Sequence, residues 1–379
     1  MAEAIFKAYW YPADGDYFDG QYLNDLQTVN VTRGRVGVQD PYKAGTASIG
    51  GRNPSDLPAI QVGDFLWVEA YPPDESVQFY MLLGRIADVQ IEYGFVENMD
   101  SYTILVEDAL ANAGRLNASG SWSAGITTAE AADDFLAGTG VTINFIDPAL
   151  AGASKVSAQT LTNANLLNVL NQLMATEQGN LTGVSNDEIQ WQGRKEFNIQ
   201  NPLAKFTDDP AEISVTPQCK YDTLNFASLA DNVANKVTVT PEGLAPQTFG
   251  TGLKSFEMNS YDQTTSQAGD LAAYVQSTLT QATDVPFKIS ARTSQQDNLS
   301  LLAMASTGVI ERSFVQIELR GNVYNCIING STVTATPSDT RVTLNLFAAD
   351  LSAFFVLDDS FYGRLQDDGP PAFNNKLGF

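Results

Sequence analysis

The chain has 379 residues, of which 44% are hydrophobic and 17% charged; this is the composition of a folded protein with about two to four domains. Histidine is absent, which excludes Ser-His-Asp triads, Cys-His pairs and histidine metal sites. The formal net charge of -23 repels phosphate backbones and argues against a dedicated nucleic-acid binder.

The sequence carries no sign of a targeting or membrane segment. "MAEAIFKAYWYPADGDY" at the start has neither a basic n-region nor an apolar h-region, and no run of about 18 apolar residues occurs. We therefore expect no signal peptide, no membrane anchor and synthesis in a cytoplasm. The two cysteines, Cys219 and Cys326, lie far apart, so we expect buried free thiols rather than a disulfide framework.

Residues 1–114 are predicted to form a first β-barrel-like domain. Short runs rich in Val, Ile, Tyr and Phe alternate with Gly, Pro, Asn and Asp. Two of these runs, "LPAIQVGDFLWVEAY" and "FYMLLGRIADVQIEY", are expected to pair through a turn at "PPDES". A further strand, "YTILVEDALA", ends in residues that can begin a helix.

The stretch "VNVTRGRVGVQDPYKAGTASIGGRNP", residues 29–54, places arginines among glycines. A Walker A loop or a dinucleotide fingerprint requires a following helix, but Pro54 and Pro58 break this region. We therefore favour a strand that bends or bulges at Gly34 and Gly37 over a phosphate-binding loop. The arginines are then expected to face carboxylates on a neighbouring strand or another subunit.

Two acidic motifs resemble functional sites without meeting their requirements. "DGDYFDG", residues 14–20, resembles a calcium loop, but its third Asp falls one position late and Asp25 stands where a bidentate Glu belongs. The adjacent pairs Asp133–Asp134 and Asp358–Asp359 point in different directions, so neither forms the carboxylate pair of a glycosidase. We predict no catalytic residue, no metal site and no cofactor.

Residues 115–200 are predicted to form a small α/β domain. "TTAEAADDFLAG" has a capping box, Thr127 with Glu130, and Gly138 at its end. "NANLLNVLNQLMATEQG" carries an apolar stripe at helical spacing and stops at Gly179. "NLTGVSNDEIQWQGR" then reads as a hairpin turned at residues 185–187.

Residues 201–350 are predicted to form a second β-barrel-like domain with one helix. Its strands are "EISVTP", "NKVTVTPEG", "SFVQIELRGNVYNCIINGSTVTATP" and "RVTLNLFAA", and its helix is "TSQAGDLAAYVQSTLTQAT", with an apolar face at Leu271, Tyr274, Val275 and Leu279. Residues 351–379 have little periodicity and are predicted to form a C-terminal tail.

The order of these segments resembles the baseplate hub, or tail-tip hub, family of minor tail proteins of long-tailed phages. The matching motifs are "TRGRV", "AGTASIGGRNP", "IQVGDFLWVEA", "LLGRIADVQIEYG", "YTILVEDALA", "LLNVLNQLMATEQGNLTGVSNDEIQWQGR", "YDTLNFASLADNVANKVTV" and "VLDDSFYGRL". The resemblance covers about residues 25 to 365 and rests on the order and spacing of the motifs.

The resemblance implies a mainly β fold with an α+β insert, assembled as a homotrimer whose paired barrels form a pseudo-six-fold ring. It implies a virion protein whose partners are the distal tail ring, the C-terminus of the tape measure protein and fibre or tip proteins. DNA would pass through an acidic lumen without specific binding. We expect Arg33, Arg35 and Arg85 to serve at subunit interfaces.

Two other functions remain open from the sequence. A β-rich receptor-binding or adhesin-like tail protein would show aromatic residues in exposed loops. A carboxylate-dependent glycan or peptidoglycan hydrolase needs paired carboxylates across a cleft, which no spacing in the sequence predicts.

Overall fold

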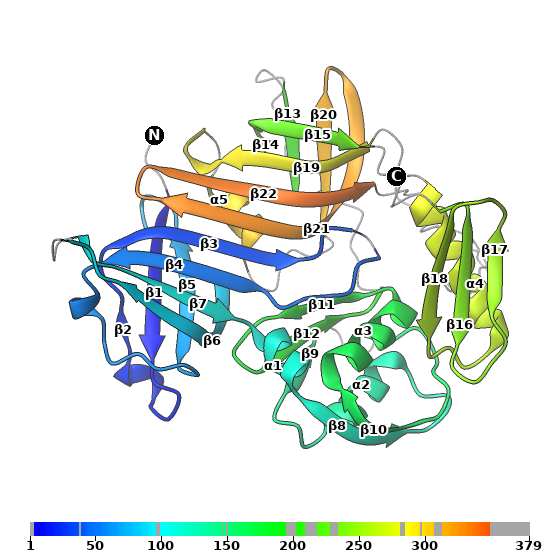
Figure 1. Ribbon diagram of the computed structural model, residues 1–379. Coiled ribbons are helices and arrows are strands. Elements are labelled where there is room, and N and C mark those ends of the chain that lie inside the picture. Colours follow the sequence, from blue (N-terminus) through cyan, green and yellow to red (C-terminus); the bar gives the residue numbers. More distant parts are fainter. Residues whose placement is uncertain are drawn as a thin grey trace, which may run out of the picture.

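The computed structural model describes residues 4–37, 39–95, 99–146, 148, 151–194, 202–208, 218–227, 234–280, 285–295, 298–306 and 313–348. Strands are the commonest element and form one 14-stranded sheet and three small sheets (Figure 1). Within this part of the chain, no helix has the length and apolarity needed to cross a membrane.

The N-terminal strands form an antiparallel sheet in the order β3-β4-β7-β6-β5-β1-β2. Their bounds are β1 (Ile5–Tyr11), β2 (Gln21–Tyr22), β3 (Leu26–Gly34), β4 (Thr46–Arg52), β5 (Phe65–Tyr71), β6 (Phe79–Glu92) and β7 (Ser101–Glu107). The predicted pairing of β5 with β6 is confirmed. The strand expected to run on past Gly34 ends there, because Gly34 has a left-handed φ of 72° and turns the chain away.

The C-terminal strands extend the same sheet. They are β13 (Ala204–Thr207), β14 (Gln218–Cys219), β15 (Thr223–Ala227), β19 (Val285–Arg292), β20 (Phe314–Leu319), β21 (Asn322–Thr336) and β22 (Asp339–Ala348). β3 joins the two groups by pairing with β21, from Val29 opposite Ala335 to Gly34 opposite Gly330. The two predicted β domains are therefore continuous through one strand pair, and closure of each into a barrel stays a prediction.

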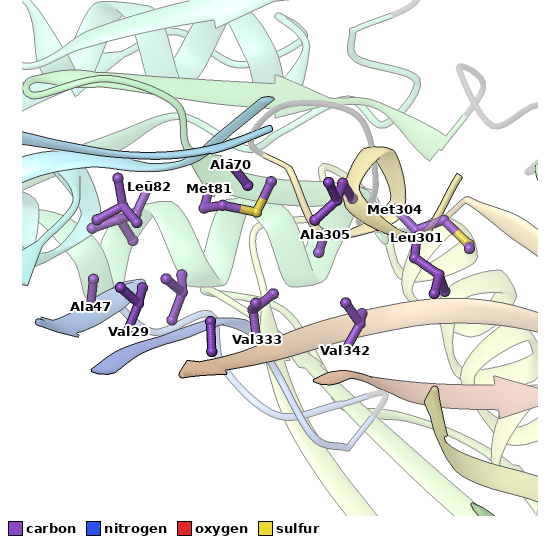
Figure 2. Packing of buried hydrophobic residues seen from close by; sticks show 14 of the residues in the cluster. Val29, Ala47, Ala70, Met81, Leu82, Leu301, Met304, Ala305, Val333 and Val342 are labelled. Carbon is purple, nitrogen blue, oxygen red and sulfur yellow. The ribbon is translucent and has the colours of Figure 1, made fainter. Parts of the chain in front are cut away.

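One hydrophobic core serves both groups of strands. Figure 2 shows Val29, Val333 and Val342 from neighbouring strands packed opposite Met81 of β6 and Ala305 of helix α5 (Asn298–Ala305). Helix α5 was not predicted from the sequence, because its apolar residues surround the helix instead of forming one stripe. Cys219 and Cys326 are fully buried in this core and form no disulfide, as predicted.

The middle of the chain forms a separate α/β unit with its own core. Its elements are α1 (Ala109–Arg115), β8 (Asn117–Trp122), α2 (Thr128–Leu136), β9 (Thr142–Phe145), β10 (Gln159–Asn165), α3 (Leu166–Glu177), β11 (Asn180–Gly183) and β12 (Glu188–Gln192). The capping box of Thr127 and Glu130 is present, and α3 ends as predicted just before Gly179. The hairpin turned at residues 185–187 is confirmed by the pairing of β11 with β12.

A second small unit lies within the range predicted as the second β domain. β16 (Lys236–Pro241), β17 (Gln247–Gly250) and β18 (Ser255–Ser260) form a three-stranded sheet covered by α4 (Thr265–Thr280), the predicted helix (Figure 1). Its core includes Val237, Leu271 and Val275. The predicted strand "EISVTP" and the predicted tail 351–379 lie outside the described residues.

Candidate functional site at the junctions between the units

Arg35 joins the end of β3 to β21 and to the loop that leads to β4. Its side chain is 9% exposed, and its Nε donates to the Asn329 side-chain oxygen at 2.9 Å. Its Nη1 donates to the Asp40 carbonyl oxygen at 3.1 Å, and the guanidinium lies 4.4 Å from the ring centroid of Tyr42. Because Tyr42 packs into the core of the α/β unit, Arg35 lies where the sheet meets that unit.

Arg33 lies on β3, two residues before Arg35, and is more buried, at 4% exposed. Its Nη1 donates to the carbonyl oxygen of Ser306, at the end of α5, at 2.6 Å. A cation at the carboxyl end of a helix is favourable because the last carbonyls carry partial negative charge. Arg33 thus contacts α5 from β3 inside one chain.

Arg85 on β6 reaches the hairpin of the α/β unit. Its Nε and Nη2 bind Oδ1 and Oδ2 of Asp187 at 3.3 and 2.5 Å, and its guanidinium lies over the Phe65 ring at 4.4 Å. Asp187 also accepts from the Asn112 side-chain amide at 3.0 Å. Arg85, which lies outside residues 29–54, thus pairs with a carboxylate of the α/β unit within the chain.

These positions bear on the predicted subunit interface. Arg33 and Arg35 are buried in a single chain, and the hydrogen bonds described above go to carbonyl and amide oxygens of that chain. The side chain of Arg85 is 36% exposed and is accessible to a neighbouring molecule. A role in a subunit interface stays a prediction for all three residues.

Asp108 connects the sheet to the α/β unit at the end of β7. Its Oδ1 caps α1 by accepting from the Leu110 amide at 3.0 Å, and its Oδ2 accepts from the Gly45 amide at 2.8 Å. Gly183 of β11 packs against this carboxylate, where an added Cβ would lie 2.4 Å from its Cγ. The sequence motif "VEDALA" contains this N-cap residue, Asp108. An Asp directly before the first residues of a predicted helix is by itself enough to suggest the cap.

Buried acidic groups lie where the α/β unit meets the β16–β18 unit. Glu177 accepts from the Thr128 hydroxyl and from the amides of Ala153 and Ser154 at 2.7 to 3.0 Å. Asp262, fully buried, accepts from the Ser260 hydroxyl at 2.8 Å through Oδ2. The pKa of Asp262 is raised to about 6, chiefly by burial; the carboxylates of Glu177 and Asp270 also raise it, whereas the Ser260 hydrogen bond and Arg194 lower it.

A cleft of about 410 Å³ lies beside Arg35, where the β3–β4 loop, α3 and β18 come together. Its lining mixes Asn and Gln side chains and the charged residues Arg35, Asp40 and Glu257 with apolar residues such as Met174, Phe256 and Met258. The described residues contain no group of three or more Cys, Asp or Glu side chains arranged to hold a metal ion. In the acidic turn of residues 14–20, Asp19 accepts from the backbone amide of Asp16.

The comparison with solved structures decides the fold. A prophage MuSo2 43 kDa tail protein from Shewanella oneidensis matches 91% of this chain and 98% of its own, with a TM-score of 0.60 and 10% identity. A tail protein from Neisseria meningitidis covers 91% and 96% at a TM-score of 0.62 and 11% identity. The Francisella PdpA–VgrG complex matches over 91% of this chain and 53% of that chain, with a TM-score of 0.51 and 10% identity.

The chain has the fold of phage tail proteins. The resemblance inferred from the sequence is thereby confirmed at the level of the fold, along nearly the whole chain. No protein-family model and no curated protein matches it in sequence. At about 10% identity the shared fold does not show which individual residues correspond. The contacts at the junctions between the units therefore come from this chain's own structure.

In this tail fold the Arg85–Asp187 pair is expected to couple the sheet to the α/β unit. A double-mutant cycle of Arg85→Ala and Asp187→Ala is expected to give a coupling energy of about 1 kcal/mol, since the pair is bidentate but its side chains are 36% and 32% exposed. Urea unfolding of the four proteins measures it. The pair of Arg115 with Glu107, whose arginine is 61% exposed, is the control and should give a smaller coupling energy. Equal coupling in the two cycles would show that Arg85 adds nothing beyond a surface ion pair.

Proposed function

We propose that the protein is a structural hub of a phage tail tip, acting without catalysis. The observation that carries this proposal is the likeness to phage tail proteins, which spans 91% of this chain and 98% of the Shewanella protein. A likeness over nearly the whole of both chains favours a shared architectural role over a borrowed domain. The hub would adapt the six-fold tail tube, or the distal tail ring, to a three-fold tip.

The proposed assembly is a homotrimer. Each chain would contribute its N-terminal and its C-terminal strands, which β3 and β21 hold together, to a pseudo-six-fold ring. The partners would be the distal tail ring above, the C-terminus of the tape measure protein in or near the lumen, and fibre or tip proteins below. Similarity to a structure solved as a PdpA–VgrG complex supports docking on further proteins.

The charge of the chain fits passage of DNA through such a ring. At a net charge of -23 an acidic lumen would repel the phosphate backbone and keep the DNA from binding during ejection. The protein would then be a virion component at the tail tip. A lumen that proved neutral or basic would remove this part of the proposal.

Cryo-electron microscopy of the intact tail tip, with the mass of the purified protein, tests the proposal. We expect three copies between the tube and the tip, and a mass of three 40.9 kDa chains, alone or on the partner ring. A six-copy tube ring or a peripheral fibre position would contradict it. Arg35→Glu is unsuited to this test, because burying a carboxylate beside Asn329 would disturb folding before assembly.

A further inference from the structure

One wall of the cleft beside Arg35 is an open edge of β18. Phe256, Glu257, Met258 and Asn259 all line the cleft. Successive residues of a strand point to opposite faces of its sheet, so a space lined by four in a row lies at the strand's edge. β18 pairs with β16 on one side, and no strand pairs with its other side among the described residues. An edge of this kind accepts an added strand.

The backbone groups along this edge point into the cleft. The carbonyl oxygens of Lys254 and Ser260 accept from amides at the two ends of β16, so the even-numbered residues of β18 direct their backbone groups toward β16. Alternation along the strand then directs the N–H and C=O groups of Glu257 and Asn259 into the cleft. The next residue in that series, Tyr261, donates its amide to a hydroxyl of α3 at 2.9 Å, which marks the end of the open edge.

The core of the β16–β18 unit is incompletely covered at the same edge. Phe256 and Met258 lie opposite Val237 and Val239 of β16, whose side chains pack against α4. The two valines are fully buried, whereas Phe256 and Met258, on the edge strand, are only partly buried. A further strand beside β18 would place alternate side chains against these two residues.

The chain leaves β22 close to both walls of the cleft. Asn345 of β22 donates its side-chain amide to the carbonyl oxygen of Arg35, on the wall opposite β18, at 3.4 Å. Phe347, two residues on and therefore on the same side of β22, packs against the core of the β16–β18 unit. In Figure 1 the end of β22 points toward that unit. The chain after Ala348 therefore starts beside the unit to which β18 belongs.

The sequence that follows contains a run suited to the open edge. Residues 351–357 read "LSAFFVL", with two aromatic residues, a β-branched one and no Gly or Pro. Phe354 follows Ala348 by six residues, which span up to about 20 Å, and the six residues of β18 span about as much. The run is thus within reach of β18 in the same copy.

We propose that residues 351–357 add as a fourth strand to the β17-β16-β18 sheet, along the open edge of β18 in the same copy. Their backbone bonds to Glu257 and its neighbours on the edge, and alternate apolar side chains cover Phe256 and Met258. The added strand fills the cleft and ties the β16–β18 unit to the sheet that carries Arg35. This inference is independent of the hub assignment.

A cysteine scan within one chain tests this. Glu257, Thr238 and Thr248 form one row across the sheet, and Glu257 and Thr248 are exposed at its two opposite edges. Glu257→Cys is combined with a cysteine at each of positions 351–357 in turn, while the native cysteines are buried. Under mild oxidation in dilute solution, we expect an intrachain disulfide at every second tail position, in about tenfold or greater excess over the same series with Thr248→Cys.

Hydrogen exchange gives an independent measurement on the chain without added cysteines. The amides of Glu257 and Asn259 should exchange about tenfold more slowly in the wild type than in a variant with both Phe354→Asp and Phe355→Asp, which changes both faces of the added strand. The amides of Val237 and Val239, on the central strand, are the control and should change less.

Each other outcome overturns the proposal. No intrachain excess over the Thr248→Cys series would mean that the run does not lie at β18. An excess without alternation would mean that it lies there but not as a strand. Disulfides between copies in place of intrachain ones would assign the edge to a second copy, and equal exchange in the wild type and the Asp variant would leave the edge open. The hub assignment is judged separately, by the position and copy number of the chain in the tail tip.

Discussion

Replacing Gly330 by alanine is expected to lower the free energy of unfolding by about 3 kcal/mol, because a side chain there has no space. A Cβ on Gly330 would lie 2.7 Å from the Arg33 carbonyl oxygen, 2.8 Å from that of Arg35 and 2.9 Å from the Arg35 amide nitrogen. These are backbone atoms of β3 and its end, which cannot rotate away. The alanine would therefore push β21 from β3, the only strand pair that joins the two parts of the large sheet among the described residues.

Urea unfolding, with hydrogen exchange of the β3 and β21 amides, measures this effect. The exchange should accelerate most along Val29–Gly34 and Gly330–Ala335, where the two strands pair. Gly269→Ala on α4 is the matched control, since an added Cβ there meets nothing within 4 Å and alanine favours the helix by about 0.5–1 kcal/mol. A Gly330→Ala protein as stable as the wild type would show that β21 relaxes without leaving β3.

The position of Gly330 also shows what the sequence could predict. Glycines among arginines indicate a bend or bulge at Gly34 and Gly37, and the chain does turn at Gly34, where φ is 72°. A further irregularity lies on β21, between Ile328 and Gly330, where its register with β22 shifts. Which of two paired strands carries the extra residue depends on their register. That register is set by contacts distant in sequence, since Arg35 and Asn329, which bond beside the bulge, are 294 residues apart.

Features that depend on residues close in sequence were predicted better than features that depend on distant residues. The capping box at Thr127, the αL residue Gln178 that ends α3, and the strand pair β5–β6 all follow from residues close in sequence. The hydrogen-bond partners of the three arginines do not follow from nearby residues. Ser306, Asn329 and Asp187 are brought to them only by the completed fold. Helix α5 was missed because a short helix apolar on all sides has no periodicity to detect.

Asp262 was not selected from the sequence either, since nothing local marks it as buried. The segment around it joins the α/β unit to the β16–β18 unit. Tyr261 donates its amide to the Thr176 hydroxyl at 2.9 Å, and the Gln263 amide donates to the Lys155 carbonyl at 3.1 Å. The backbone of Asp262 forms an isolated antiparallel β-bridge with Val156. Its Oδ1 is buried without a hydrogen-bond partner among the described residues. An ionised carboxylate there is poorly solvated.

Replacing Asp262 by asparagine is therefore expected to stabilise the protein by about 2 kcal/mol at pH 8 and to give no gain at pH 4.5. The pKa of Asp262 is raised from 3.8 to about 6 in the folded protein, chiefly by burial. The folded state thus favours the protonated acid, and that contribution to stability is present below about pH 4 and lost as the pH rises through about 6. At pH 8 the loss amounts to about 3 kcal/mol, from which about 1 kcal/mol is subtracted for the new, unpartnered amide N–H.

Urea unfolding of the wild type and of Asp262→Asn, at several pH values between about 4.5 and 8, measures the difference. The gain of the variant should grow through about pH 6 and then level off. Asp133→Asn, at an exposed position of α2, controls for the chemistry of the replacement and should stay within about 0.5 kcal/mol of the wild type at each pH. A variant less stable than the wild type at about pH 8 would mean that Arg194 solvates the ionised carboxylate well enough to outweigh burial. Asp262 would then hold the two units together as an ion pair instead of weakening their junction as the carboxylate ionises.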